Sequence, residues 1–306
     1  MNDDVYGIKK WGNDILEILE NGNIGLKNPF HPDNSPADLI KIIKSLNERR
    51  ISCPVLLRVT DYLAFRIKLI NNSFFRAIRE IRYKGEYKGV FPVKVNQQAQ
   101  VIDRIVEFGK EFDFGLEVGS KPELLIALAH DLSANSTIIC NGIKDREFIH
   151  LAILSIKIGF KTILVLESPR ELDLIIKISK ELNVRPLLGI RVKLTNKVSG
   201  NWSQSSGDRS AFGLSVEQVM EVINKLKIYD YLDCLILQHS HLGSQIPDII
   251  EIRKATQEAC RFFSEMSKLG APLTYLDLGG GLGVDYTGEQ KSSFNSINSV
   301  SYTHLR

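Results

Sequence analysis

The stretch that decides the fold covers residues 137–194 and reads TIICNGIKDREFIHLAILSIKIGFKTILVLESPRELDLIIKISKELNVRPLLGIRVKL. Three β-branched runs, at 137–140, 162–166 and 186–194, alternate with two segments of helical periodicity, at 145–159 and 169–182. Ser168 and Pro169 mark a helix start, because proline fits the first position of a helix. Short strands that alternate with helices through short loops predict parallel βαβ units.

The same alternation continues on both sides of this stretch. Further strands are expected at 90–96, 112–118, 232–241 and 273–278, and further helices at 120–132, 215–229 and 248–269. Doubly wound sheets and (β/α)8 barrels share this rhythm. We prefer an α/β fold of the TIM-barrel type, with seven of eight strands present, because the units follow one another without a break. Lys94, Glu117 and Arg191 also each lie between apolar neighbours, which would face the helices and leave the charged side chain pointing inward.

The first 60 residues follow a different pattern. Clusters of Gly, Asn and Pro are followed by a basic amphipathic helix at 37–49, a strand at 53–59 and a long helix at 61–83. We therefore divide the chain into an N-terminal segment, 1–60, an incomplete (β/α) barrel, 61–298, and a short tail, 299–306. A barrel of seven strands would leave the edges of its first and seventh strands unpaired.

The composition indicates an ordinary globular protein. The 306 residues carry 39 Lys and Arg against 36 Asp and Glu, a net charge of +3 that gives no reason to expect nucleic-acid binding. No apolar run approaches the roughly 20 residues of a membrane span, and residues 1–12 have no signal-peptide character. The four cysteines form no CxxC pair. These features predict a reduced, soluble, cytoplasmic protein that binds neither nucleic acid nor membrane.

Lys94, in the stretch VFPVKVN (90–96), is the first candidate for chemistry. A lysine that loses its hydration inside an apolar barrel becomes a nucleophile toward carbonyl groups. The alternative is a solvated lysine at a strand edge, which is the commoner environment of this residue type. Its place between two valines at the end of the first barrel strand favours the inward orientation.

Two further stretches end the sixth and seventh predicted strands. HSHLGSQ (239–245) offers a histidine that can stack on a planar ring, and Ser244, which can bind a phosphate. His239 and His241 could instead hold a metal, although no other ligand lies nearby in the sequence, or be hydrogen-bonded core residues. DLGGGLG (277–283) has the glycines of an anion-binding turn but lacks both the dinucleotide fingerprint and the P-loop lysine. An inward lysine, a stacking histidine and an anion-binding turn together fit pyridoxal phosphate.

The chain resembles the biosynthetic arginine decarboxylases of bacteria and plants, which are pyridoxal-phosphate enzymes of the alanine-racemase-like fold group. The resemblance rests on VYGI and WG near the start (5–8 and 11–12), VKVNQ (93–97), GLEVGSK (115–121), CNGIKDRE (140–147) and GGGLGVDY (279–286). CNGIKD and the opening stretch are the most diagnostic, because the related ornithine, lysine and diaminopimelate decarboxylases share mainly the other motifs.

The resemblance implies a role for each matching residue. Lys94 would bind the aldehyde of pyridoxal phosphate covalently, with Glu117 beside it and Arg191 near the cofactor. His241 would stack on the pyridine ring. The phosphate would be held by Ser244, Gly279, Gly280 and Gly281. The substrate site would be lined by Leu276, Asp277, Leu278, Gly279, Gly280, Gly281, Leu282, Gly283, Val284, Asp285 and Tyr286. Lys94, His241 and Glu117 are the implied catalytic residues.

The implied reaction is decarboxylation of L-arginine to agmatine and CO2, the first step of putrescine and spermidine biosynthesis. The resemblance also implies a homo-oligomer, either a dimer or a tetramer of dimers. Magnesium accompanies the family, but no ligand set for Mg2+ is recognisable in this sequence. Two alternatives stay open: action on another basic amino acid (ornithine, lysine or diaminopimelate) or racemisation, and a non-catalytic paralogue that binds pyridoxal phosphate.

The chain departs from the family in two respects. Ala211 precedes Phe212-Gly213-Leu214, where the family usually has a lysine. Family members also continue far beyond Tyr286, through an eighth strand and a β-domain to which residues 1–60 would contribute. We therefore expect the chain to be an N-terminal fragment that is inactive alone, with a tail at 299–306 that is unlike the family.

Overall fold

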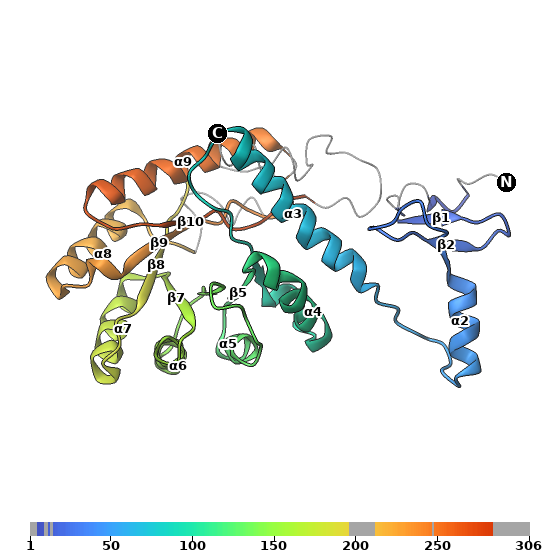
Figure 1. Ribbon diagram of the computed structural model, residues 1–306. Helices are drawn as coiled ribbons and strands as arrows, with labels where there is room; N and C mark the ends of the chain where they lie inside the picture. The colour runs from blue at the N-terminus through green and yellow to red at the C-terminus, as the bar shows by residue number, and fades with distance from the viewer. Residues whose placement is uncertain (1–4, 9–11, 13–14, 196–211, 247, 284–306) are drawn as a thin grey trace. The chain divides into compact units, whose positions relative to one another are not determined.

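The computed structural model describes residues 5–8, 12, 15–195, 212–246 and 248–283 (Figure 1). These residues form two compact units, of which the first ends at Leu69 and the second runs from Ile70 to Gly283. The long helix α3 (Thr60–Glu80) belongs to both, because the division falls inside it.

The first unit is a small antiparallel sheet followed by a helix. Strands β1 (Leu16–Ile18), β2 (Ile24–Leu26) and β3 (Ala37–Asp38) pair in the order β1-β2-β3, and α2 (Leu39–Glu48) follows directly. Asp38 joins the two parts. One carboxylate oxygen accepts hydrogen bonds from the Ile40 and Lys41 backbone, at 2.9 and 3.2 Å, and the other accepts one from the Asn23 side chain at 2.9 Å. This is an ordinary N-cap, which satisfies two backbone donors of the first helical turn.

The predicted strand at 53–59 is wrong, since these residues form neither a strand nor a helix. Pro54 has no N–H to donate to a sheet. Leu56 and Leu57 are exposed, so no neighbouring surface buries the side chains that made this segment look like a strand.

After α3, the described residues of the second unit form seven parallel strands that alternate with six α-helices. The strands are β4 (Val90–Pro92), β5 (Gly115–Val118), β6 (Thr137–Cys140), β7 (Lys161–Leu166), β8 (Leu187–Arg191), β9 (Leu235–His239) and β10 (Tyr275–Asp277). The helices are α4 (Ala99–Gly109), α5 (Lys121–Leu128), α6 (Arg146–Lys157), α7 (Pro169–Leu182), α8 (Val216–Tyr229) and α9 (Ile249–Lys268).

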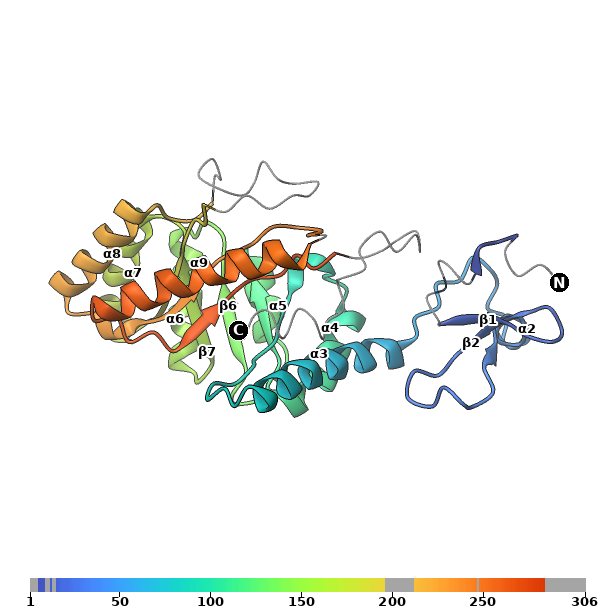
Figure 2. The same cartoon turned by 90° about the horizontal axis from the view of Figure 1, so that it is seen from above.

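The strand order decides between the two architectures that the sequence allowed. Neighbours in the sheet follow the chain from β4 to β10 without a reversal, and all pairs are parallel. A doubly wound sheet would reverse its order once to place helices on both faces. Here the sheet curls and the helices follow its outer side (Figures 1 and 2). The predicted barrel-type fold is therefore confirmed, with β4 and β10 at the edges of the described sheet.

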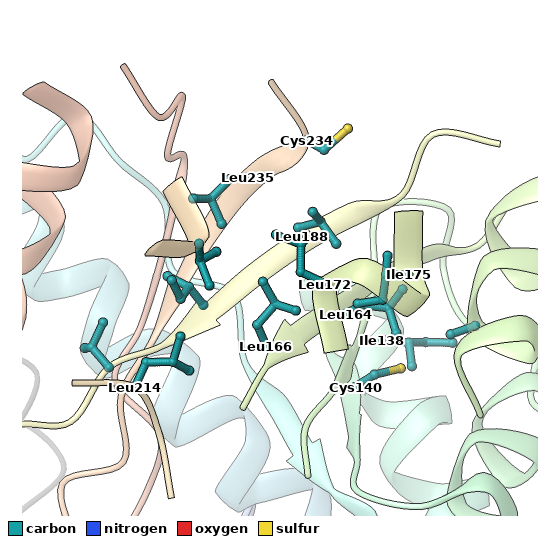
Figure 3. Packing of buried hydrophobic residues seen from close by; sticks show 14 of the residues in the cluster. Ile138, Cys140, Leu164, Leu166, Leu172, Ile175, Leu188, Leu214, Cys234 and Leu235 are labelled. Atoms are coloured by element: carbon teal, nitrogen blue, oxygen red, sulfur yellow. The ribbon is translucent and has the colours of Figure 1, made fainter. Parts of the chain in front are cut away.

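The main core lies between the outer face of this sheet and the helices. Figure 3 shows alternate residues of neighbouring strands, such as Ile138, Leu164 and Leu188, side by side with Leu172 and Ile175 of α7. The residues between them point to the opposite, inner face, where a smaller cluster forms. It contains Ile139, Ile163, Val165 and Leu237. This two-residue period is what allows one face to be packed by helices while the other lines the barrel interior.

The helix boundaries follow the local signals in the sequence. Ser168 caps α7 through the backbone N–H of Arg170, and Ser215 forms a capping box with Gln218 at the start of α8. Gly270, with a φ of +99°, follows the end of α9, where the chain needs a left-handed residue. These positions agree with the predicted starts and stop.

The first barrel strand is shorter than predicted. Instead of continuing to Asn96, β4 ends at Pro92 and the chain turns through a 3-10 helix, Val93–Val95. Val93 is fully buried, whereas Lys94 lies on the exposed side of the turn. Because β4 pairs only with β5 among the described strands, nothing on its other side keeps the chain extended.

The packing predicts a large difference between two leucines on different helices of the second unit, α7 and α5. Leu172 is fully buried, and replacing it with alanine should lower the free energy of unfolding by about 2–5 kcal/mol, because the cavity cannot close completely. Leu125 on α5 is 56% exposed, so Leu125→Ala is a matched control with a much smaller effect. Urea denaturation followed by circular dichroism measures both. Equal losses in the two variants would contradict this description of the core.

Candidate functional site

Polar side chains gather where the inner face of the sheet reaches the C-terminal ends of its strands. Arg191, His239 and Asp277 occupy matching positions in the register of β8, β9 and β10. Glu117 holds the equivalent end of β5. Along the strands, these polar residues come after the small apolar cluster of the inner face. The inner face therefore changes from apolar to charged toward the C-terminal ends of the strands, which we call the rim. The C-terminal rim is also where barrels of this kind hold their active sites.

Lys94 and Glu117 face each other at this rim. The Lys94 ammonium lies 3.7 Å from one oxygen of Glu117, and the other oxygen accepts a hydrogen bond from the Asn141 side chain at 3.1 Å. Asn141 Oδ1 is buried and has no hydrogen-bond partner among the described residues. The rim therefore holds an amine, a carboxylate and an unsatisfied buried acceptor close together.

The expected burial of Lys94 is wrong. Its side chain is 64% exposed, whereas that of Glu117 is 9% exposed. The cause is the early end of β4, which carries Lys94 past the strand onto the rim. The pairing with a buried carboxylate, rather than loss of hydration, is what distinguishes Lys94 from a surface lysine in this structure.

Arg191 is held by a residue that the sequence analysis did not single out. Its guanidinium donates to Glu167 Oε1 at 2.7 Å and lies over the ring of Phe212, 5.1 Å from the centroid. Although burial alone would raise the pKa of Glu167, the charge and hydrogen bond of Arg191, the charge of Lys144 and the Gly142 N–H together lower it. Glu167 is thus a stable anion beside Arg191. The only sequence signal was its position between a predicted strand and the Ser168 helix start.

His239 is a hydrogen-bonded interior residue. Its Nδ1 lies 2.8 Å from Asp277 Oδ2, and the other oxygen of Asp277 accepts the Gly279 N–H at 2.8 Å. Burial alone would raise the pKa of Asp277, but its interaction and hydrogen bond with His239 and the hydrogen bond from the Gly279 N–H lower it. Asp277 therefore ties the end of β9 to the glycine turn. The alternative that His239 and His241 hold a metal finds no support, since the described residues contain no group of three or more potential ligands.

The glycine turn packs tightly against the loop that follows β9. Gly279 has a φ of +68°, and a Cβ there would lie 2.8 Å from Ser240 O and 2.9 Å from His241 Nδ1. A Cβ on Gly281, whose φ is +103°, would lie 1.9 Å from Gly243 O. Side chains are therefore excluded at both positions. Gly280 faces open space.

The remaining predicted site residues fall into four groups. Ser244 follows Gly243, so its loop adjoins the glycine turn. Leu276 and Leu278 pack against the cluster under the helices, on the side opposite Asp277. Leu282 and Gly283 are the last part of the turn that the structure describes. The predicted substrate residues Val284, Asp285 and Tyr286 lie outside the described residues, as do Ala211 and the tail at 299–306.

His241 is neutral at pH 7. Desolvation by the surrounding protein, together with the positive charges of His239, Arg191 and Lys94, lowers its pKa to about 4, against a weaker opposing effect of Asp277. The side chain itself remains exposed at the rim. An uncharged imidazole with an open surface is suited to stacking on a flat aromatic ring.

These residues fit a bound pyridoxal phosphate. An aldehyde needs an amine, which Lys94 offers, and an aromatic ring needs a stacking partner, which His241 offers. A phosphate needs a turn that lets it approach the backbone, which the side-chain-free face at Gly280 provides. The unsatisfied Asn141 Oδ1 adds a buried acceptor for a donor group. The described residues contain no group of three or more His, Cys, Asp or Glu side chains that could hold a metal ion.

The diagnostic stretch CNGIKD proves to hold the rim together. Asn141 contacts Glu117, and Asp145 caps α6 through the Phe148 N–H. Lys144 is completely buried, donates to the carbonyls of Gly142 and Val165, and lies 3.4 Å from Glu171. Sequence reasoning missed Asn141 and Glu167, whose partners lie in other βα units.

Comparison with known proteins gives a consistent result. A family model described as pyridoxal-dependent decarboxylase, pyridoxal binding domain, matches residues 69–306. A biosynthetic arginine decarboxylase from Prochlorococcus marinus (strain MIT 9312) is 47% identical over 293 residues, which cover 96% of this chain and 45% of that protein. A relative of the same name from Gloeobacter violaceus is 44% identical with the same coverage. The chain thus spans less than half the length of these relatives.

Solved structures agree with this similarity. The crystal structure of the biosynthetic arginine decarboxylase from Campylobacter jejuni has a TM-score of 0.86 and 33% identity, and the match covers 98% of this chain and 48% of that chain. A diaminopimelate decarboxylase from M. jannaschii, at 22% identity and a TM-score of 0.72, shares the fold. None of the helices in the described parts of the chain is both long and apolar enough to cross a membrane. With the family model matching most of its length, the chain belongs to the pyridoxal-dependent decarboxylases, and the match is to their pyridoxal-binding domain.

Proposed function

We propose that this chain is the cofactor-binding part of a protein that decarboxylates L-arginine to agmatine and CO2 with pyridoxal phosphate. The observation that carries the proposal is the 47% identity to a biosynthetic arginine decarboxylase over 96% of the chain. Since the chain covers 45% of that relative, the activity is proposed for the complete protein. The complete protein would act in the cytoplasm as a homo-oligomer, and residues 1–60 would belong to its β-domain.

The proposed role of Lys94 is to bind the cofactor aldehyde through its amine. Glu117 lies 3.7 Å away, and its second oxygen is occupied by Asn141. The Lys94 side chain is therefore less free to change its orientation than an ordinary surface lysine, because one oxygen of the fixed, buried Glu117 carboxylate attracts its ammonium group. Glu117 also places a negative charge 3.7 Å from the Lys94 nitrogen.

The other residues would orient and hold the cofactor. His241 presents a neutral ring for stacking, and the turn at Gly279, Gly280 and Gly281, with Ser244 in the adjoining loop, would hold the phosphate. Arg191 lies at the same rim with its guanidinium fixed by Glu167. When bound, pyridoxal phosphate supplies the electron-accepting ring on which loss of CO2 depends.

The choice of substrate is tested by turnover. The complete protein should release CO2 from arginine and give little or none from ornithine, lysine or diaminopimelate, with agmatine identified by mass spectrometry. If the protein prefers one of the other amino acids, the proposed substrate is wrong, although the proposed cofactor site still stands. Cofactor binding without CO2 release from any of them would indicate the non-catalytic alternative.

Lys94→Ala should abolish covalent attachment of the cofactor. In the complete protein, borohydride reduction in the presence of pyridoxal phosphate should label the Lys94 peptide, and the substitution should remove that label. CO2 release should fall on the order of 10³-fold or more, because a covalent amine is not replaced by another group. Lys110→Ala is the control, since Lys110 is an exposed lysine paired with Asp131. Labelling elsewhere, or activity that survives Lys94→Ala, would contradict the assigned role.

His241 should act through its ring and not through its charge. His241→Phe keeps an uncharged aromatic ring and should bind pyridoxal phosphate within about threefold of the wild type, whereas His241→Ala should bind it roughly threefold to tenfold more weakly. Cofactor titration followed by absorbance gives both values. Equal weakening in the two variants would show that stacking is not the contribution of this residue.

The lowered pKa of His241 predicts a pH effect on stability. Between pH 6.5, the ordinary value, and about 4, the unfolded chain binds a proton at His241 that the folded chain does not. Stability should therefore fall as pH decreases through this window, and His241→Phe should reduce that decrease. Thermal melting of cofactor-free protein across the window tests this. A ring titration by NMR with its midpoint near 6.5 would contradict it.

A further inference from the structure

Glu167 has more partners at the rim than its place in the sequence suggests. It directly follows β7, and its side chain is only 3% exposed. A buried carboxylate is costly unless charges and hydrogen bonds compensate it. The groups that surround the Glu167 carboxylate therefore indicate which parts of the chain this buried anion holds together.

Three donors from three parts of the chain converge on this carboxylate. Oε1 accepts from Arg191 Nη1 at 2.7 Å and from the Gly142 N–H at 3.1 Å, and Oε2 accepts from the Gly213 N–H at 3.3 Å. Gly142 lies in the loop after β6, Arg191 ends β8, and Gly213 lies between β8 and α8. One side chain thus fixes the ends of neighbouring βα units relative to one another.

Glycine at two of these positions allows the close approach. Gly142 has a φ of +73°, and a Cβ there would lie 2.9 Å from Gly119 O. Gly213 has a φ of +81°, and a Cβ there would lie 3.3 Å from the Arg191 side chain. Any other residue would be strained in backbone conformation at both positions and would press on its neighbours. Glycine at both positions therefore lets the backbone adopt, without strain, the conformation in which these amides donate to Glu167.

A second carboxylate holds Glu167 itself in place. Glu171 accepts the Glu167 N–H at 2.9 Å with one oxygen and the Lys144 N–H at 2.8 Å with the other. The Lys144 ammonium lies 3.4 Å from Glu171. Two anions and two cations, including Arg191, therefore balance in one buried network. Two contacts fix the position of the Arg191 guanidinium. One is with Glu167 of this network, and the other is with the ring of Phe212.

We propose that Glu167 is a positioning residue for the cofactor site, which orients Arg191 and holds the loop ends at Gly142 and Gly213 around it. The inference rests on the proposed function, since it assigns Arg191 to the cofactor. Among the described residues, the Glu167 carboxylate bonds to Gly142, Arg191 and Gly213, and of these Arg191 is the predicted cofactor-binding residue. Its effect on the cofactor is expected to pass through that guanidinium.

A double-mutant cycle in the complete protein tests this proposal. The variants are Glu167→Gln, Arg191→Gln and the pair, with Glu181→Gln as the control, because Glu181 is on α7 and forms an exposed ion pair with Arg146. The dissociation constant of pyridoxal phosphate is measured by absorbance titration, and the melting temperature is measured without cofactor. Each single substitution should weaken cofactor binding by about ten- to a hundredfold, since each removes a charge-assisted hydrogen bond. The double variant should be no weaker than the worse single variant.

A purely structural role would give a different pattern. Glu167→Gln would then lower the melting temperature of the cofactor-free protein but bind pyridoxal phosphate as tightly as Glu181→Gln, which would overturn the proposal. Fully additive losses of cofactor affinity would also overturn it, because the two residues would act independently.

Two controls keep the result interpretable. If Glu167→Gln fails to fold, Glu167→Asp retains the charge on a shorter side chain, and an intermediate loss of cofactor affinity is expected from it. An affinity equal to that of the wild type would contradict the proposal. Failure of the wild type to bind pyridoxal phosphate would remove the proposed function and this inference together, whereas wild-type binding with an unaffected Glu167→Gln variant would remove the inference alone.

Discussion

The rim of the sheet depends on one constraint: charges that sit at the ends of inner strands must be paired where water is scarce. Glu117, Arg191 and Asp277 each point to the inner face and each has a partner from another βα unit. A parallel sheet whose strand order follows the chain brings these ends to one side. Each of these contacts therefore connects two βα units at the rim, and the same contacts hold the strand ends and loops that carry the candidate site residues.

Local signals were enough to predict the regular part of the fold. The strand at 137–140 and the helix at 169–182 have the predicted limits, because a β-branched run or a capped amphipathic stretch determines each. The barrel type followed from the repeated units and from the charges between apolar neighbours. The predictions at 53–59 and 93–96 were wrong because strand formation there required a partner strand. Whether a segment pairs depends on the neighbouring strands of the sheet, and this cannot be predicted from the residues of the segment itself.

The candidate site was predictable to the same extent. The inward-facing Glu117 and Arg191 and the glycine turn at Gly279–Gly281 were visible because a strand or turn pattern surrounds each. Glu167 and Asn141 were not, since their importance lies in contacts with residues 24 positions away. The exposure of Lys94 was missed for a related reason, because the end of β4 depends on its place at the sheet edge.

The stretch CNGIKD, on which the family resemblance mainly rests, contributes contacts that hold the rim together and none of the predicted catalytic residues. In CNGIKD, Asn141 orients Glu117, Gly142 donates to Glu167, Lys144 neutralises Glu171 and Asp145 caps α6. A substitution of Asn141, Lys144 or Asp145 would leave a buried charge or a backbone donor unsatisfied. A side chain at Gly142 would strain the backbone and crowd Gly119. Many different folds can place a lysine where it reacts with an aldehyde. Few loop sequences, in contrast, can make all four of these contacts at once. Recognition of a chain through such a loop therefore reports the scaffold that surrounds the chemistry, and the identity of the substrate has to come from residues that contact it.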